Sequence, residues 1–187
     1  PGGGLDNEEL IAGGFVDRYY ALVEFNLTNS PPIAGSCYLE LYCSGHNGAT
    51  PTTMILDRIG VAWDWNRTDR LWWANRPAAI QWLADPIPAP VAESWYRIDI
   101  TNLYNDWKSG TVPNYGVQLR PVDINNKFNV FHSSEYAADP TLRPRLVITP
   151  SATAPVISST LTVGGAVGQP FTYTISANGT SPITYTA

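Results

Sequence analysis

The sequence predicts an all-β fold, a β-sandwich that carries one short helix, and three observations lead to this prediction. Short segments with an apolar residue at every second position recur along the chain, separated by turns rich in Gly and Pro. Only the segment around 100–110 has apolar residues at helical spacing. The apolar content of 44% suffices for a packed core. Many short strands with few helices are typical of two sheets packed face to face.

The first half of the chain supplies a loop and then several strands. Residues 1–14 are Gly-rich and are interpreted mostly as loop, and the first expected strand is Tyr19–Leu27. The next is Ser36–Ser44, followed by the strand-like segments Met54–Trp65 and Leu71–Trp73. The residues of Ser36–Ser44 expected to point inward are Cys37, Leu39, Leu41 and Cys43. Along one extended strand, Cys37 and Cys43 would lie roughly 20 Å apart, too far for a disulfide, so we interpret both as buried thiols.

The stretch Trp95–Arg120 organises the second half. It begins as a strand and then changes to helical spacing, with a single apolar face made of Ile100, Leu103, Tyr104 and Trp107. Asp99 and Thr101 are candidate N-caps, and Gly110 is placed where the helix should end. Three further strands are expected, at Tyr115–Leu119, Phe128–Ser133 and Arg145–Thr149.

The composition changes after Thr149, which predicts a domain boundary. Residues 1–149 would form the first domain, 150–157 a Pro/Ser/Thr-rich linker, and 158–187 part of a second domain. The strands expected in this second unit are Ser158–Val163, Phe171–Ala177 and Ile183–Ala187. Three strands bury too little apolar surface to be stable alone.

Charge and composition exclude several classes of function. The net charge is −5 and only 14% of residues are charged, which argues against nucleic acid and anionic membrane surfaces as partners. No apolar run is long enough to span a bilayer, so we expect no membrane insertion. Little Lys and much Thr, Asn, Gly and Trp indicate an extracellular or cell-surface protein. Three sequons, at Asn26, Asn66 and Asn178, are compatible with glycosylation, with chance occurrence as the alternative.

No set of residues predicts catalysis, a metal or a cofactor. His132, Ser133 and Glu135 are too close in sequence to form a triad on one strand, and His132 is interpreted as structural. Carboxylates that could act as a glycosidase pair are present, but nothing in the sequence brings two together; they are Asp57, Asp64, Asp99 and Glu135. Cys and His do not occur at metal-ligand spacing. We therefore predict that the protein is not an enzyme and has no cofactor.

Clustered tryptophans are the remaining functional signal. Five occur in one short region, namely Trp63, Trp65, Trp72, Trp73 and Trp82. If Trp73 faces the core then Trp72 faces solvent, which makes Trp72 the best candidate for stacking on a sugar, with Trp65 and Trp82 as further candidates. Core packing is the alternative for all of them.

Several motifs resemble the DNRLRE (disaggregatase-related) domain, which is related to carbohydrate-binding modules. The matching segments include Arg18–Leu27, Trp95–Thr101, Asp106–Gly110 and Arg143–Val147. The sequence departs from the family pattern at Arg67 and Trp72. The resemblance implies a jelly-roll-like β-sandwich from a secreted or surface protein. Residues 155–187 resemble the opening of a bacterial putative Ig domain, which implies a partial Ig-like β-sandwich after the first domain.

Two functional hypotheses follow. The family pattern begins with a strand that this sequence lacks before Pro1, and the Ig-like part is incomplete, so both units would leave unpaired sheet edges. Copies of the chain joined head to tail could complete one another by strand complementation, which predicts a structural or adhesive filament subunit or one repeat unit of a tandem-repeat protein. The alternative is a carbohydrate-binding module with a polysaccharide as its partner. The sequence analysis favours the structural hypothesis.

Overall fold

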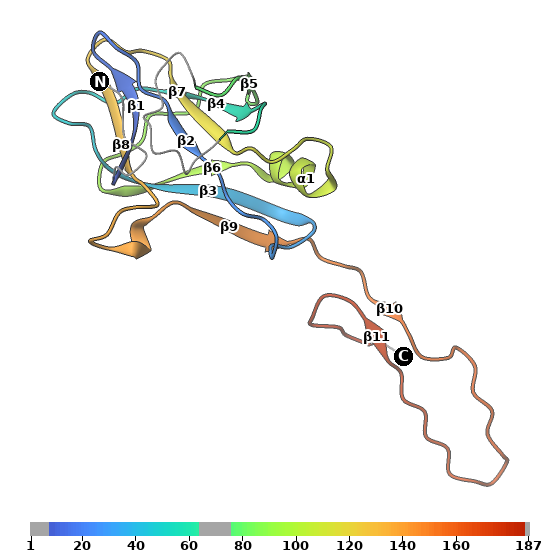
Figure 1. Cartoon of the computed structure of the whole chain (residues 1–187). Coiled ribbons are helices and arrows are strands. Elements are labelled where there is room, and N and C mark those ends of the chain that lie inside the picture. The colour runs from blue at the N-terminus through green and yellow to red at the C-terminus, as the bar shows by residue number, and fades with distance from the viewer. Residues whose placement is uncertain (1–7, 64–75, 186–187) are drawn as a thin grey trace.

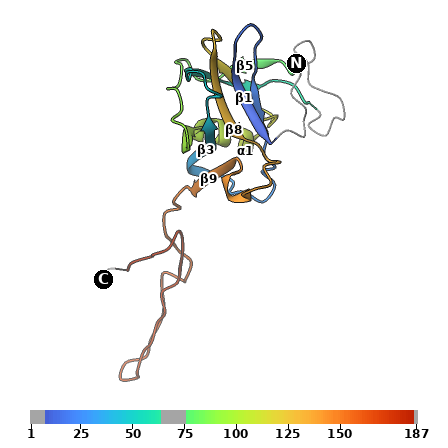
Figure 2. The same cartoon turned by 90° about the vertical axis from the view of Figure 1, so that its left-hand side faces the viewer.

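The protein is a sandwich of two antiparallel sheets with one helix at an end (Figures 1 and 2), as predicted. The computed structural model describes residues 8–63 and 76–185. The strands of the five-stranded sheet are β1 (Glu9–Gly14), β8 (Lys127–His132), β3 (Ala34–Gly45), β6 (Ser94–Asp99) and β9 (Arg145–Pro150). Those of the four-stranded sheet are β2 (Ala21–Val23), β7 (Val117–Pro121), β4 (Met54–Ile59) and β5 (Ala79–Gln81). A short 3₁₀ helix, Pro140–Leu142, precedes β9.

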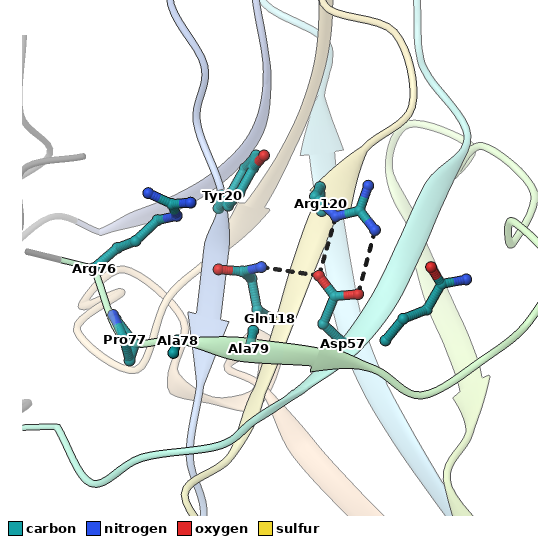
Figure 3. A pocket seen from close by; sticks show the side chains of 9 residues that line it. Tyr20, Asp57, Arg76, Pro77, Ala78, Ala79, Gln118 and Arg120 are labelled. Atoms are coloured by element: carbon teal, nitrogen blue, oxygen red, sulfur yellow. Dashed lines mark hydrogen bonds and ion pairs between the residues drawn. The ribbon is translucent and has the colours of Figure 1, made fainter. Parts of the chain in front are cut away.

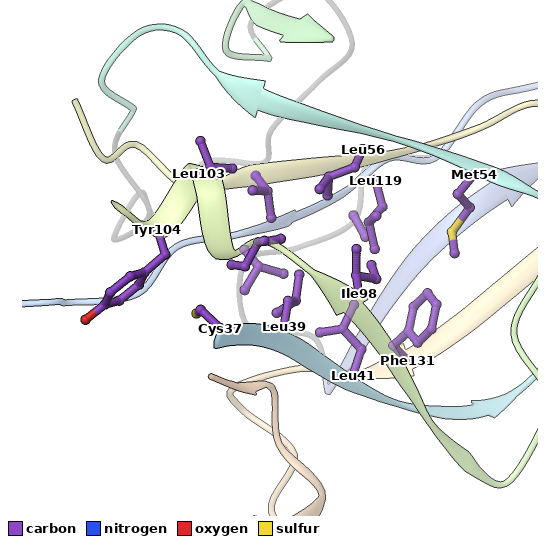
Figure 4. Packing of buried hydrophobic residues seen from close by; sticks show 14 of the residues in the cluster. Cys37, Leu39, Leu41, Met54, Leu56, Ile98, Leu103, Tyr104, Leu119 and Phe131 are labelled. Atoms are coloured by element: carbon purple, nitrogen blue, oxygen red, sulfur yellow. The ribbon is translucent and has the colours of Figure 1, made fainter. Parts of the chain in front are cut away.

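Strand β3 is the centre of the five-stranded sheet. It pairs with β6 along one side and with β9 and β8 along the other. Its inward side chains were predicted correctly and are completely buried: Cys37, Leu39, Leu41 and Cys43. Both cysteines are free thiols, as the spacing argument required. Figure 4 shows Cys37, Leu39 and Leu41 on one side and Met54, Leu56 and Leu119 of the other sheet facing them, so the core lies between the two sheets.

Helix α1 (Thr101–Ser109) covers one end of this core, and its buried side chains include Leu103, Tyr104 and Trp107, as predicted. Ile100 occupies the N-cap position, and the Asp99 carboxylate accepts hydrogen bonds from the Thr101 backbone N–H and hydroxyl. The helix ends at Gly110, which has the left-handed conformation expected of a C-cap glycine. The side-chain amide of Asn105 bonds both the N–H and the C=O of Ala34, which ties the helix to the start of β3.

Several predicted boundaries differ from the structure. Residues 9–14, interpreted as loop, form β1, because pairing with β8 satisfies their backbone groups. The strand expected over Tyr19–Leu27 is regular only at Ala21–Val23, although Phe25 and Leu27 do pack against the core. Strand β4 ends at Ile59, β5 was not predicted, and the strand expected at Leu71–Trp73 lies outside the described residues.

The C-terminal segment lies outside the sandwich (Figure 1). Its described part forms a single pair of two-residue strands, β10 (Val156–Ile157) and β11 (Ala177–Asn178). The strands expected at Ser158–Val163 and Phe171–Ala177 are absent as continuous elements, and no strand forms over 183–185. The apolar side chains of these segments remain exposed, as Leu161 and Phe171 illustrate, because no second sheet covers them.

Candidate functional site

A groove of about 360 Å³ lies on the outer face of the four-stranded sheet (Figure 3). It receives side chains from four segments of the chain: the residue before β2, the middle of β4, β7, and β5 with the three residues before it. The residues that line it are Tyr20, Asp57, Arg76, Pro77, Ala78, Ala79, Gln81, Gln118 and Arg120. Leu56 and Leu119 point to the core from the same strands, so strand alternation turns Asp57, Gln118 and Arg120 outward.

The floor of the groove is a polar network centred on Asp57. This residue is only 4% exposed, and strand register places it directly opposite Gln118. Asp57 Oδ2 accepts hydrogen bonds from Arg120 Nε at 3.1 Å and from Gln118 Nε2 at 2.9 Å. Because a buried carboxylate is costly unless it is paired, these two bonds hold all three side chains in a fixed arrangement.

Gln118 presents one unsatisfied polar atom. The side chain is 3% exposed, and its Oε1 accepts no hydrogen bond from the part of the chain that the structure describes. Figure 3 shows this oxygen directed away from Asp57, toward the side of the groove occupied by Tyr20 and Arg76. The groove therefore contains a preorganised acceptor beside the guanidinium of Arg120.

Tyr20 and Arg76 form the rim. The Tyr20 ring is half-buried, and the Arg76 guanidinium carbon lies 5.9 Å from its centroid, at the outer limit of a cation–π contact. Rim and floor together offer an aromatic ring, two guanidinium groups, an amide and a carboxylate. Asp57 is the one carboxylate among the described residues of the lining, and it is engaged in an ion pair. A glycosidase needs two carboxyl groups about the scissile bond, and the described lining supplies one.

The opposite face of the sandwich has more aromatic residues, but their ring faces are already covered. The Arg97 guanidinium lies 3.7 Å from the Tyr38 ring centroid, and that of Arg145 lies 3.9 Å from the ring of Trp95. Both arginines also pair with Glu40, at 3.5 Å and 2.8 Å. A stacking ligand would have to displace these guanidinium groups.

His132 belongs to this second face and is packed rather than poised for chemistry. Its ring is stacked on Tyr136, with centroids 3.5 Å apart, and on Tyr42 at 5.4 Å. Burial lowers the pKa of the imidazole, an effect that the nearby carboxylates of Glu8 and Glu9 oppose. The structural interpretation of His132 fits this packing, although its Nδ1 has no hydrogen-bond partner within residues 8–63 and 76–185.

Of the three sequence-predicted sugar-binding residues, the structure describes only Trp82. Trp82 is half-buried and packs against the hydrophobic core, whereas Trp65 and Trp72 lie outside the described residues. The roles proposed for these tryptophans stay predictions. Of the sequons, Asn26 and Asn178 are exposed and Asn66 lies outside the described residues, and their glycosylation also stays a prediction.

Sequence reasoning missed most of the groove. Asp57 was considered only as one of several unpaired carboxylates, and the groove residues without a predicted role are Tyr20, Arg76, Gln118 and Arg120. The available signal was the outward position of Gln118 and Arg120 on a strand whose other side chains are apolar. In the described part of the chain, no three His, Cys, Asp or Glu side chains are grouped so that they could hold a metal ion. No described helix has the length and apolar character needed to cross a membrane.

Fold and groove together define a β-sandwich binding module. The model of carbohydrate-binding module family 96 matches residues 9–150, from the start of β1 to the end of β9. The chain belongs to this family. A search of curated proteins found no match.

The family match revises two of the sequence-based expectations. It supports a carbohydrate-binding-module-like domain but not the DNRLRE name that the motifs suggested. It ends before residue 158, so the partial Ig-like unit and the proposed domain boundaries stay predictions. Of the two functional hypotheses, family membership favours the carbohydrate-binding module over the filament subunit.

Proposed function

We propose that the protein is a non-catalytic, extracellular carbohydrate-binding module whose glycan ligand lies in the groove on the outer face of the four-stranded sheet. The observation that carries this proposal is the convergence of Tyr20, Asp57, Gln118 and Arg120 in one concave site within a chain of this family. The ligand class comes from the family, and the location comes from the groove.

The chemistry of the groove suits a sugar. A sugar ring has hydroxyl groups that both donate and accept hydrogen bonds, and C–H faces that pack on an aromatic ring. The groove supplies donors from Arg76 and Arg120, an acceptor from Gln118, and the ring of Tyr20. Because the Asp57 network fixes the floor before the ligand arrives, little side-chain entropy is lost on binding.

The test uses two matched pairs of Tyr and Arg on opposite faces of the sandwich. Affinity electrophoresis in gels containing β-glucan, xylan, mannan or polygalacturonate measures retardation of the native chain. We expect Tyr20→Ala with Arg76→Ala to weaken binding at least about tenfold, the effect of losing roughly 1.4 kcal/mol. Tyr38→Ala with Arg97→Ala removes an equivalent pair from the five-stranded sheet and should leave the retardation unchanged.

Loss of binding in the control variant alone, with thermal unfolding unaltered, would move the site to the opposite face. Loss of binding in a Trp72→Ala variant alone would instead favour the tryptophan cluster. The hypothesis of a filament built from copies of the chain remains a separate prediction. Negative-stain microscopy of the purified protein would show fibres if it is correct and isolated particles if it is wrong.

A further inference from the structure

The groove contains a buried acceptor without a donor among the residues that the structure describes. Gln118 is 3% exposed, and none of the described residues donates to its Oε1. An unsatisfied buried polar atom is costly, and such atoms are uncommon in native proteins. Gln118 lines a groove that can admit a ligand, and a ligand that displaces the side chains covering this oxygen can donate a hydrogen bond to it.

The orientation of the Gln118 amide follows from its partner. The Asp57 carboxylate is an acceptor only, and it already pairs with Arg120. The Gln118 NH₂ group must therefore face Asp57, where Nε2 donates at 2.9 Å. Rotating the amide by half a turn would bring two acceptor oxygens together, so the carbonyl oxygen is held facing the groove.

The neighbouring charged groups restrict what can satisfy this oxygen. Arg76 and Arg120 can only donate hydrogen bonds to a ligand, because guanidinium has no acceptor. A ligand group that interacts with both Gln118 and an arginine must donate to one and accept from the other. A hydroxyl group does both, whereas an ether or ester oxygen can only accept.

We propose that Gln118 is a specificity-determining residue that accepts a hydrogen bond from one sugar hydroxyl, so that the groove binds glycans in which this hydroxyl is free. Methylation or acetylation of the same hydroxyl removes the donor and leaves Oε1 buried without a partner. The selected class is thus an unsubstituted glycan, and the inference rests on the proposed function of the groove.

Gln169 provides a control of the same residue type outside the groove. It is exposed on the C-terminal segment and is not among the residues that line the groove. Solvent can therefore hydrate its side-chain acceptor. Gln169→Met and Gln118→Met make the same chemical change, and only the second removes the buried acceptor.

The experiment titrates the native chain with cellohexaose, xylohexaose, mannohexaose and an oligogalacturonate, followed by heteronuclear NMR of the side-chain amides. The Gln118 signals are identified by their absence in Gln118→Met. We expect the oligosaccharide that binds to shift these signals, because a donor at Oε1 polarises the amide. Gln118→Met should weaken binding about tenfold, whereas Gln169→Met should change it less than about twofold. O-methylation of the same oligosaccharide should lower its affinity for the native chain more than its affinity for Gln118→Met.

The outcomes separate this inference from the proposed function. Binding that depends on Tyr20 and Arg76 but leaves the Gln118 signals unshifted would overturn the role of Gln118 alone. Equal affinity of the native chain for free and O-methylated oligosaccharide would do the same. Absence of binding to every probe would overturn both proposals. Should Gln118→Met fail to fold, as judged by circular dichroism, the NMR shifts and the O-methylated probe on the native chain decide the question.

Discussion

Two glycines with nearly the same backbone conformation allow a quantitative test of how the groove is built. Gly116 immediately precedes β7 and has φ of 82°, and Gly110 ends α1 with φ of 77°. A Cβ at Gly116 would lie 2.2 Å from the Val23 carbonyl oxygen and 2.9 Å from Glu24 Cα. A Cβ at Gly110 would meet nothing within 4 Å. Alanine is therefore strained at both positions, but it clashes only at the first.

The expected costs follow from this difference. The left-handed conformation costs an L residue about 1–2 kcal/mol, which is the whole expected cost of Gly110→Ala. At Gly116 the added methyl must also push β7 from β2 by roughly 1 Å, since carbon–oxygen contacts are normally about 3.3 Å or longer. That displacement disrupts the short pairing of Ala21–Val23 with β7. With about 1 kcal/mol per lost hydrogen bond, Gly116→Ala should cost about 3–5 kcal/mol.

Urea unfolding followed by tryptophan fluorescence measures both costs. A domain of this size has a total stability of about 5–15 kcal/mol, so Gly116→Ala should fold with a clearly lower midpoint. It should also weaken glycan binding, because β7 carries Gln118 and Arg120 past Tyr20. If the two variants differ by less than about 0.5 kcal/mol, the close approach of β2 and β7 is not a constraint and the reasoning is wrong.

Three further predictions concern the core and the opposite face. Burial, with a smaller contribution from the charge of Asp99, raises the pKa of the Cys37 thiol to about 12. A thiol reagent should therefore label neither Cys37 nor Cys43 until urea unfolds the chain. Rapid labelling of the native protein would contradict this prediction. Burial lowers the pKa of His132, so the folded state favours the neutral ring, and its stabilising contribution is present above the unfolded pKa of about 6.5 and is lost as pH falls. The drop in melting temperature from about pH 7.5 to about pH 5.5 should shrink in His132→Phe, and an unchanged drop would assign it to other groups. Leu103→Ala should lower the free energy of unfolding in urea by about 3–5 kcal/mol. The exposed helical control Asn102→Ala should change it by less than about 0.5 kcal/mol. Similar costs for the two variants would show that α1 does not close the core.

The features that the sequence predicted correctly are those encoded by local periodicity. The alternation Cys37, Leu39, Leu41 and Cys43 needs only one buried face to define both the strand and its orientation. The spacing of Leu103, Tyr104 and Trp107 defines the helix in the same way, and Gly110 ends it because a left-handed residue is needed there. Each of these elements carries its own pattern.

The features that were missed depend on distant partners. Strand β1 is Gly-rich and has low intrinsic strand propensity, and it is ordered because β8 pairs with it over its full length. The segment Phe171–Ala177 shows the converse, since its alternation is clear but no sheet covers it, and it remains largely irregular. An alternating apolar pattern is thus neither required nor sufficient for a strand to form. What decides is whether a neighbouring strand is present to pair with the segment.

The groove illustrates the same dependence for function. Asp57 and Gln118 are far apart in sequence, and they become neighbours only through the register that pairs β4 with β7. The sequence analysis singled out tryptophans as candidate sugar-binding residues. On the five-stranded sheet, however, the rings of Tyr38 and Trp95 are stacked against Arg97 and Arg145, each less than 4 Å from the guanidinium carbon. Across the sandwich, the Gln118 amide donates to Asp57, and its Oε1 is directed away from that carboxylate. Two buried side-chain polar atoms lack a hydrogen-bond partner among the described residues. Gln118 lines the groove, whereas the ring of His132 on the five-stranded sheet is stacked on Tyr42 and Tyr136. Only the first therefore combines an unused acceptor with a concave site.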